Sequence, residues 1–172
     1  MKKQGFTLIE LMVVIVIMGI LAAVAVPKLF GMIAKSKASE IGTAAGSYVK
    51  LQDAYVAEAG AMGNWGKIGY AMKNGDTFDY EDKYTGYSQT DKTVLVANLA
   101  TDGTLGWTAT SKVKLNDCVN ASTWQVKVYA ASSSGAEGMV GYKTAVSAQN
   151  CSDLTPSFKK LASKDTDVSE GN

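Results

Sequence analysis

The hydrophobic residues of this chain are concentrated near its N-terminus. Between Leu11 and Val26 lie 16 residues without a charge or a strongly polar side chain. The wider stretch 6–26 would be about 31 Å long as a helix, and the hydrocarbon core of a bilayer is about 30 Å thick. The pattern therefore predicts a helix that can cross a membrane, with Lys2 and Lys3 on the cytoplasmic side and the rest of the chain outside.

An amphipathic helix is expected to continue this apolar run. Gly19 and Pro27 interrupt the run, and we expect them to kink the helix within the membrane. Beyond them, residues predicted to share one helical face recur as Phe30, Ile33, Ala34, Ala38, Ile41, Ala45, Tyr48 and Ala54 or Tyr55. Stop signals from Gly60 onward predict a helix over residues 6–59, about 80 Å long. A 172-residue chain cannot bury such a rod, so its first half must contact lipid or other subunits.

The C-terminal half has the pattern of a small β-rich head. Residues 61–92 are rich in glycine, asparagine, aspartate and tyrosine, which predicts a long connecting loop, and its aromatic residues predict that it packs down on the head. The β-rich stretches that follow are 93–99, 103–107, 123–129 and 139–146. Three or four antiparallel strands laid on the amphipathic helix would bury both apolar faces, so the fold class is α+β.

This pattern divides the chain into consecutive parts. They are a leader of residues 1–5, a membrane helix of 6–27, an amphipathic half-helix of 28–60, the loop 61–92 and a head of 93–172. Cys118 and Cys151 bound one region of that head.

Composition argues against catalysis. The chain has 17 lysines, no arginine, no histidine and 16 acidic residues, for a formal charge of +1. Histidine is the commonest general base and metal ligand, and two cysteines cannot form a cysteine-rich zinc site. A near-neutral chain without arginine is also unlike a nucleic-acid-binding protein. We therefore expect no enzyme, no catalytic residue, no cofactor and no nucleic-acid partner.

One acidic group is a candidate metal site. It comprises Asp76, Asp79, Glu81 and Asp82, whose oxygen atoms are of the kind that calcium prefers. Their spacing lacks the EF-hand pattern, so we expect a solvated loop and no metal site.

Two interpretations compete for the N-terminal segment. A basic start, an apolar stretch and the small residues at 23–25 suit an ordinary signal peptide of an exported binding or enzymatic domain. Glu10 opposes that interpretation, because a carboxylate costs about 2.5–3.5 kcal/mol at mid-bilayer and a disposable signal gains nothing from it. An ionisable residue inside a membrane-spanning segment indicates that this residue has a function and pairs with another charged or polar group.

The residues around Glu10 match a specific motif. Gly5-Phe6-Thr7-Leu8-Ile9-Glu10-Leu11, followed by the apolar run, resembles the class III signal of type IV pilins and type II secretion pseudopilins. The resemblance implies that a prepilin peptidase cuts between Gly5 and Phe6 and that the new Phe6 amine is N-methylated. It also implies that Glu10 pairs with the Phe6 amine of a neighbouring subunit, which suits a carboxylate that is costly to bury alone.

The same resemblance extends to other positions. In this family, the positions matching Gly19 and Pro27 bracket a segment that loses helical order in assembled filaments, so we expect 19–27 to be helical in the membrane and able to extend in a fibre. Cys118 and Cys151 would lie in an oxidising compartment, where we expect one disulfide that stabilises the fold by about 3–4 kcal/mol. It resembles the C-terminal disulfide loop of type IV pilins, which is less typical of major pseudopilins.

The predicted function is that of a structural pilin subunit. The resemblance implies storage in the bacterial inner membrane with the head outside the cytoplasm, then polymerisation with identical copies into an extracellular helical filament. Further partners would be the prepilin peptidase, the pilus assembly platform and a motor ATPase. The alternatives are a minor pilin or pseudopilin and, less favoured, an exported domain with an ordinary signal peptide.

Overall fold

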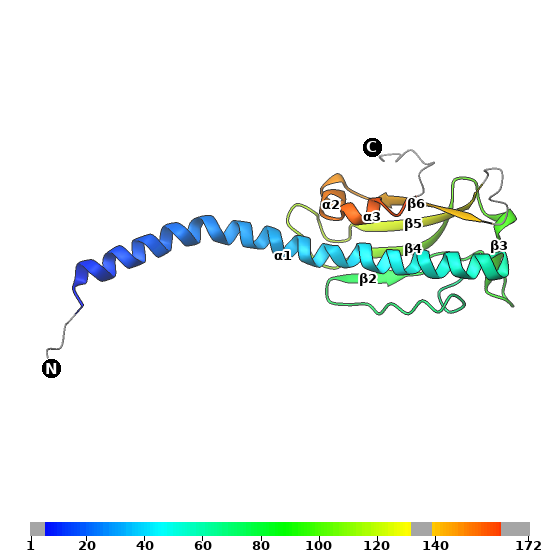
Figure 1. The fold of residues 1–172 in the computed structure, drawn as a ribbon, viewed down its shortest axis with the longest axis horizontal. Coiled ribbons are helices and arrows are strands. Elements are labelled where there is room, and N and C mark those ends of the chain that lie inside the picture. Colours follow the sequence, from blue (N-terminus) through cyan, green and yellow to red (C-terminus); the bar gives the residue numbers. More distant parts are fainter. Residues whose placement is uncertain (1–5, 132–138, 163–172) are drawn as a thin grey trace.

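One long helix organises the molecule. The computed structural model describes residues 6–131 and 139–162, in which α1 (Leu8–Ala59) runs past the whole head and projects beyond it (Figure 1). Thr7 caps its start, and Gly60, with φ of 63°, ends it in the left-handed region. Pro27 lies inside the helix without ending it. The predicted end is confirmed, whereas the helix starts at Leu8 because Thr7 is in extended conformation.

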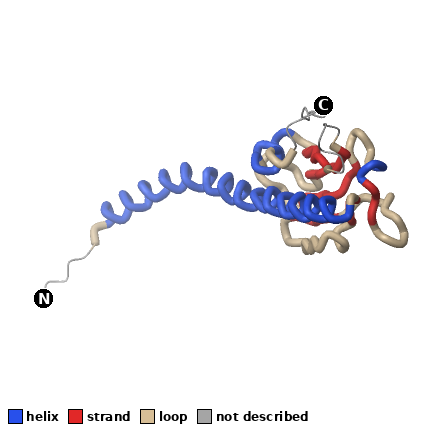
Figure 2. The backbone as a smooth tube through the Cα atoms, turned by 45° about the vertical axis from the view of Figure 1, so that its right-hand side comes forward, coloured by secondary structure: helices blue, strands red, loops and turns tan. Residues whose placement is uncertain are grey.

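The head consists of two antiparallel sheets beside the C-terminal half of α1 (Figures 1 and 2). The strands are β1 (Ala61–Gly63), β2 (Phe78–Glu81), β3 (Thr93–Leu95), β4 (Thr104–Ser111), β5 (Thr123–Ala130) and β6 (Val140–Val146). The larger sheet has the order β2-β4-β5-β6, and a two-stranded sheet pairs β1 with β3. A 3-10 turn (Val96–Asn98) follows β3, and α2 (Gln149–Leu154) and α3 (Pro156–Lys159) follow β6. The predicted α+β class is confirmed.

Three local predictions need correction. The segment 61–92 is not only a loop, because it contains β1 and β2. The stretch 93–99 yields three strand residues that pair with β1 instead of joining the main sheet. These strands are three or four residues long, too short for alternating polarity to distinguish them from a loop. The short helices α2 and α3 were not predicted, although Pro156 at the first position of α3 is a helix-start signal.

The core lies between the sheet and one face of α1. The alternation predicted for β5 is confirmed, because Trp124, Val126 and Val128 are fully buried. The buried face of α1 comprises Ala34, Ala38, Ile41, Ala44, Ala45, Tyr48, Gln52 and Val56. Phe30 and Ile33 were expected on this face but are exposed, because the head covers α1 only from Ala34 onward.

Gly106 allows the closest approach between β4 and α1. The pairing of β4 with β5 shifts register between Leu105 and Trp107, and a Cβ atom on Gly106 would overlap the Tyr48 hydroxyl. That hydroxyl is buried and has no hydrogen-bond partner among the residues that the structure describes.

Tyr48→Phe is therefore expected to raise the free energy of unfolding by about 1 kcal/mol, because it removes a buried hydroxyl that lacks a partner. Chemical denaturation of the full chain in detergent measures this change. Tyr142→Phe is the matched control and should be destabilising, since the Tyr142 hydroxyl donates to Asp53 Oδ1 at 2.7 Å. A less stable Tyr48→Phe protein would contradict the assignment.

Tyrosine–carboxylate hydrogen bonds join the sheet to α1. The Tyr80 hydroxyl donates to Glu40 Oε1 at 2.7 Å, and Tyr142 makes the corresponding bond to Asp53. Partial burial raises the pKa of Asp53 from its ordinary value of 3.8, and the hydrogen bond from Tyr142 offsets part of this rise.

Asp53→Asn is expected to change how stability depends on pH. The raised pKa means that the folded state favours the protonated carboxyl, so the stability from Asp53 is present below pH 3.8 and is lost as pH rises through the raised pKa. Asparagine keeps an acceptor for Tyr142 and does not titrate, so the variant should gain stability over the wild type as pH rises from 4 to 7. Denaturation across this range measures the difference. The exposed Asp91→Asn is the control, and a pH-independent difference for Asp53→Asn would contradict the expectation.

Candidate processing and assembly site

Glu10 and Thr7 form a reciprocal cap at the start of α1. The Thr7 backbone N–H and hydroxyl both donate to Glu10 Oε2, at 2.8 and 2.7 Å, and the Glu10 N–H donates to Thr7 Oγ1 at 3.3 Å. This is a capping box, in which two helix-terminal donors are satisfied by side chains. The positive end of the helix dipole also favours a carboxylate in the first turn.

The cap gives Glu10 a partner within its own subunit. Two donors from one residue satisfy the carboxylate oxygen, but neither neutralises its charge. No lysine pairs with Glu10 in the described parts of the chain, 6–131 and 139–162. Sequence reasoning had assigned Glu10 an external partner and missed Thr7, although the Thr-x-x-Glu spacing is the signal of this cap. The carboxylate is thus held at the helix start with its charge still uncompensated.

Phe6 stands next to this carboxylate. It precedes the helix and is exposed, as suits a residue that would become a new N-terminus. Gly5 lies outside the described residues, so cleavage between Gly5 and Phe6 stays a prediction.

The first half of α1 packs against no other part of the chain that the structure describes. Every residue from 6 to 30 is exposed, and large apolar side chains cover the helix on all sides. Within the described ranges, α1 is the one helix long and apolar enough to cross a membrane. Gly19 has open space around it, and Pro27 is in helical conformation. The helical state expected for 19–27 is present, and its extension in a fibre stays a prediction.

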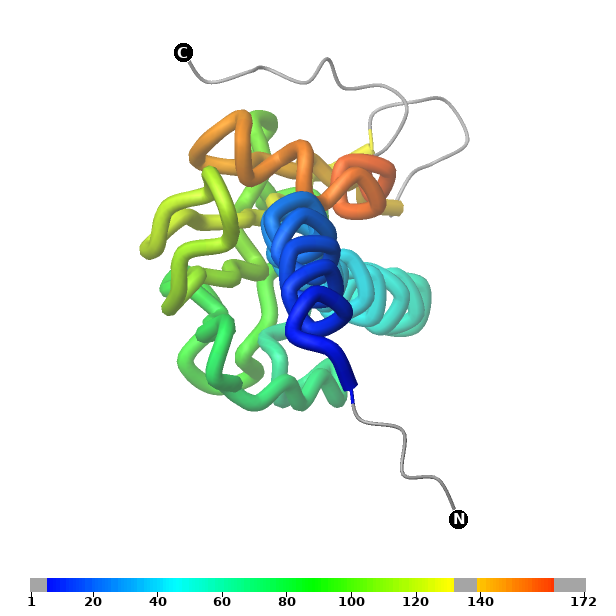
Figure 3. The backbone as a smooth tube through the Cα atoms, turned by 90° about the vertical axis from the view of Figure 1, so that its left-hand side faces the viewer, coloured from blue at the N-terminus to red at the C-terminus, as the bar shows by residue number. Residues whose placement is uncertain are grey.

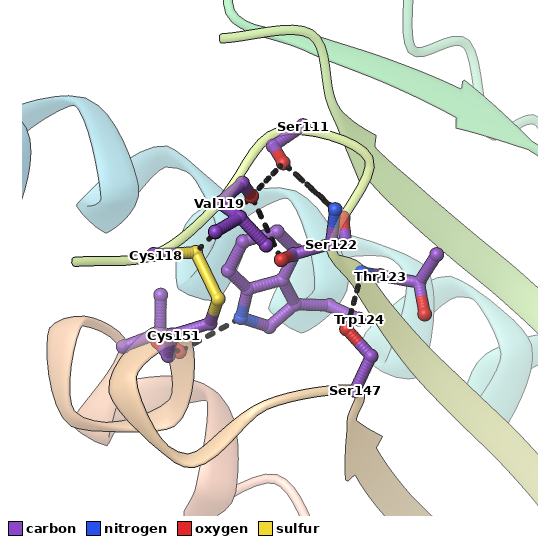
Figure 4. The surroundings of a disulfide bond; sticks show 9 residues. Ser111, Cys118, Val119, Ser122, Thr123, Trp124, Ser147 and Cys151 are labelled. Atoms are coloured by element: carbon purple, nitrogen blue, oxygen red, sulfur yellow. Dashed lines mark hydrogen bonds between the residues drawn. A yellow bond between two sulfur atoms is a disulfide. The ribbon is translucent and has the colours of Figure 1, made fainter. Parts of the chain in front are cut away.

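Cys118 and Cys151 form the expected disulfide (Figure 4). It joins the loop 112–122, which follows β4, to α2. Both cysteines are fully buried, and the indole of Trp124 lies beside them. The Trp124 Nε1–H donates to Thr155 Oγ1 at 2.9 Å, and the Thr155 hydroxyl donates to the Cys151 carbonyl at 3.2 Å. The disulfide therefore belongs to a hydrogen-bonded unit that includes β5.

A close helix contact holds the disulfide region against α1. A Cβ atom on Gly42 would overlap the Ser157 side chain of α3, so glycine is needed for this approach. Sequence reasoning missed Gly42, since small residues in a helix carry no signal of what approaches them.

The acidic residues of the candidate metal site do not converge on one point, and three of them contact different partners. Asp79 pairs with Lys112 at 3.4 Å and Glu81 pairs with Lys83, whereas Asp82 accepts a hydrogen bond from the Trp65 backbone N–H at 3.2 Å. No cluster of three or more potential metal ligands occurs among the residues with described placement.

Comparison with known proteins identifies the family. Residues 1–26 match the model of the prokaryotic N-terminal methylation motif. The chain is 33% identical over 144 residues to fimbrial protein EcpC of Eikenella corrodens, covering 70% of this chain and 94% of that protein. The chain belongs to the type IV pilin family.

Further relatives of this pilin carry similar names. It is 34% identical over 139 residues to a type IV major fimbrial protein, FimA, of Dichelobacter nodosus, which covers 72% of this chain and 86% of that protein. It is 38% identical over 80 residues to the type IV major pilin protein PilA of Myxococcus xanthus, but this match spans only 36% of that protein and 46% of the pilin. No solved structure gives a significant match.

Proposed function

We propose that this pilin is stored in the inner membrane as a precursor, processed at Gly5–Phe6, and polymerised into an extracellular filament. The observation that carries the proposal is the fully exposed apolar half of α1 with a single capped carboxylate at its start. A soluble monomer would leave this whole surface in water, whereas a bilayer and a filament core both cover it. Relatives named as major pilin and major fimbrial proteins support the same conclusion.

The disulfide supports the proposed orientation. Cys118 and Cys151 are joined in the head, and disulfides persist in oxidising compartments. A single pass that places the head outside the cytoplasm meets this condition. The lysines do not decide the orientation, because Lys2 and Lys3 precede the apolar segment whereas Lys28, Lys35 and Lys37 follow it.

The hydrophobic effect alone does not favour α1 in the filament over α1 in the membrane, so assembly needs another interaction. Lipid tails and a bundle of helices are both apolar, so moving α1 between them has little hydrophobic driving force. Processing creates an ammonium group at Phe6, and Glu10 of a neighbouring subunit carries the opposite charge. Two buried charges are costly alone and tolerable as a pair, so their pairing would fix the axial register of each incoming subunit.

The cap supports a role for Glu10 in both the stored and the assembled state. In the isolated subunit Thr7 donates two hydrogen bonds to Glu10 Oε2, so the carboxylate of a stored pilin is hydrogen-bonded although its charge is not neutralised. In the filament the same carboxylate would turn to the neighbour's amine. A contact between unlike surfaces of identical subunits extends as an open helix when it does not close. A motor ATPase and an assembly platform would supply the work.

Analysis of the N-terminus of sheared surface filaments tests the proposal. The expected result is a protein that begins with N-methylated Phe6 and forms the principal band of the filament fraction. A mature protein that begins after Ala25 would overturn it in favour of an ordinary signal peptide. Correct processing without a band in the filament fraction would indicate a minor pilin or pseudopilin instead.

A further inference from the structure

The apolar surface of α1 does not stop where the membrane-spanning segment ends. Leu29, Phe30, Met32 and Ile33 are 57%, 63%, 64% and 43% exposed, and the first buried residue of the helix is Ala34. Seven residues thus separate Val26 from the head, and four of them carry large apolar side chains in the open.

The length of this stretch places it in the headgroup layer of a bilayer. The helical residues 8–26 span about 28 Å, close to the hydrocarbon core of about 30 Å, and residues 27–33 add about 10 Å. Headgroups extend the bilayer by roughly 5–8 Å on each side. A modest tilt of the helix shortens its reach further. The head therefore begins at the outer boundary of the membrane, with no spacer to hold it away.

The loop 112–122, which contains Cys118, lies at the same depth along α1 as this exposed stretch. A Cβ atom on Gly31 would lie 3.5 Å from Asn116 Nδ2, so the loop 112–122 contacts α1 below the first buried turn. Figure 1 shows this end of the head nearest the N-terminal half of α1, and Figure 3 shows that chain segments flank the helix where it enters the head. Val119 in this loop is 56% exposed, although its neighbour Cys118 is fully buried.

The charges around this level are mostly positive. Lys28, Lys35 and Lys37 are exposed on α1, and no acidic residue lies between Glu10 and Glu40. The loop adds the exposed residues Lys114 and Asp117, while its remaining lysine, at 112, is paired with Asp79. Lysines near a bilayer surface attract anionic lipid headgroups.

We propose that the loop 112–122 rests in the headgroup layer of the stored subunit, where Lys114 and Lys28 bind anionic phospholipids. This inference rests on the membrane anchoring proposed above. Val119 and the exposed side chains of 29–33 sit among the headgroups, and the lysines contact their phosphates. The head is thereby held down on the membrane until the subunit is withdrawn into a filament.

Lipid cross-linking of the full-length chain in vesicles tests this contact. The protein is reconstituted in phosphatidylcholine with or without phosphatidylglycerol, plus a phospholipid that carries a photoreactive diazirine at headgroup depth. Mass spectrometry then maps the labelled peptides. We expect labelling of 112–122 in phosphatidylglycerol vesicles, reduced about threefold or more by Lys114→Glu and by high salt.

Lys67→Glu is the matched control. Lys67 is exposed and adjoins Ile68, which lies near Tyr55 and Gly63 at the far end of α1, so its reversal should not change labelling of the loop. An unlabelled loop in vesicles that carry the protein would overturn the proposal. Equal labelling of the loop in wild type and Lys114→Glu would also overturn it. Failure of the protein to float with vesicles would instead overturn the membrane anchoring itself.

Discussion

Glu10→Gln is expected to leave the pilin in the membrane and to reduce filaments by at least about tenfold, since breaking a buried ion pair costs about 3–5 kcal/mol. Glutamine retains an oxygen that can accept both hydrogen bonds from Thr7, so the start of α1 should stay intact. The one property removed is the negative charge. The result would therefore report on pairing with the neighbour's amine.

Immunoblots of sheared filaments and of the membrane fraction measure this effect. Thr7→Ala is the complementary variant, because it removes the two hydrogen bonds of the Thr7 hydroxyl and keeps the charge of Glu10. It should cost about 1 kcal/mol at the helix start and leave filament assembly near the wild-type level. Normal filament assembly by Glu10→Gln would refute the pairing, and loss of filaments in Thr7→Ala alone would assign assembly to the cap.

Replacing both Cys118 and Cys151 by alanine is expected to lower the free energy of unfolding by about 3–4 kcal/mol. The bridge closes a loop of 33 positions, so its removal enlarges the entropy of the unfolded chain. In the folded state it joins the loop 112–122 to α2, which no strand pairing connects to that loop. The expected loss is a large share of the 5–15 kcal/mol typical of a domain.

Denaturation of the full chain in detergent, monitored by tryptophan fluorescence, measures this loss. Trp124 lies next to the bridge and reports on its surroundings (Figure 4). Serine replacements at the two cysteines provide a comparison, since they place hydroxyl groups in a fully buried site and should be at least as destabilising. An unchanged unfolding midpoint for the alanine protein would contradict a stabilising role.

Much of the fold was predictable because its signals are local. The apolar run, the stop at Gly60 and the alternation of β5 each arise from neighbouring residues, and the helix, its end and the buried face of β5 that they predict are confirmed. The assembly motif is likewise contiguous, so its residues could be named without a structure. The disulfide could be predicted because the chain has only two cysteines and the head was expected in an oxidising compartment.

The remainder depends on contacts between distant segments. Phe30 and Ile33 have the periodicity of a buried face, yet whether the head reaches them depends on where the loop 112–122 ends. Gly42 and Gly106 are needed because Ser157 and Tyr48 approach them, and neither approach has a signature in the sequence. The short strands β1 and β2 are stabilised by partners far along the chain.

The disulfide also has a mechanical consequence for a fibre under load. In the proposed filament, tension would enter each subunit through α1 and leave through the head contacts of its neighbours. The 33 positions between Cys118 and Cys151 correspond to about 110 Å of extended chain. Because the bridge closes this length into a ring, pulling cannot release it, and under tension only the parts of the head outside the ring can extend.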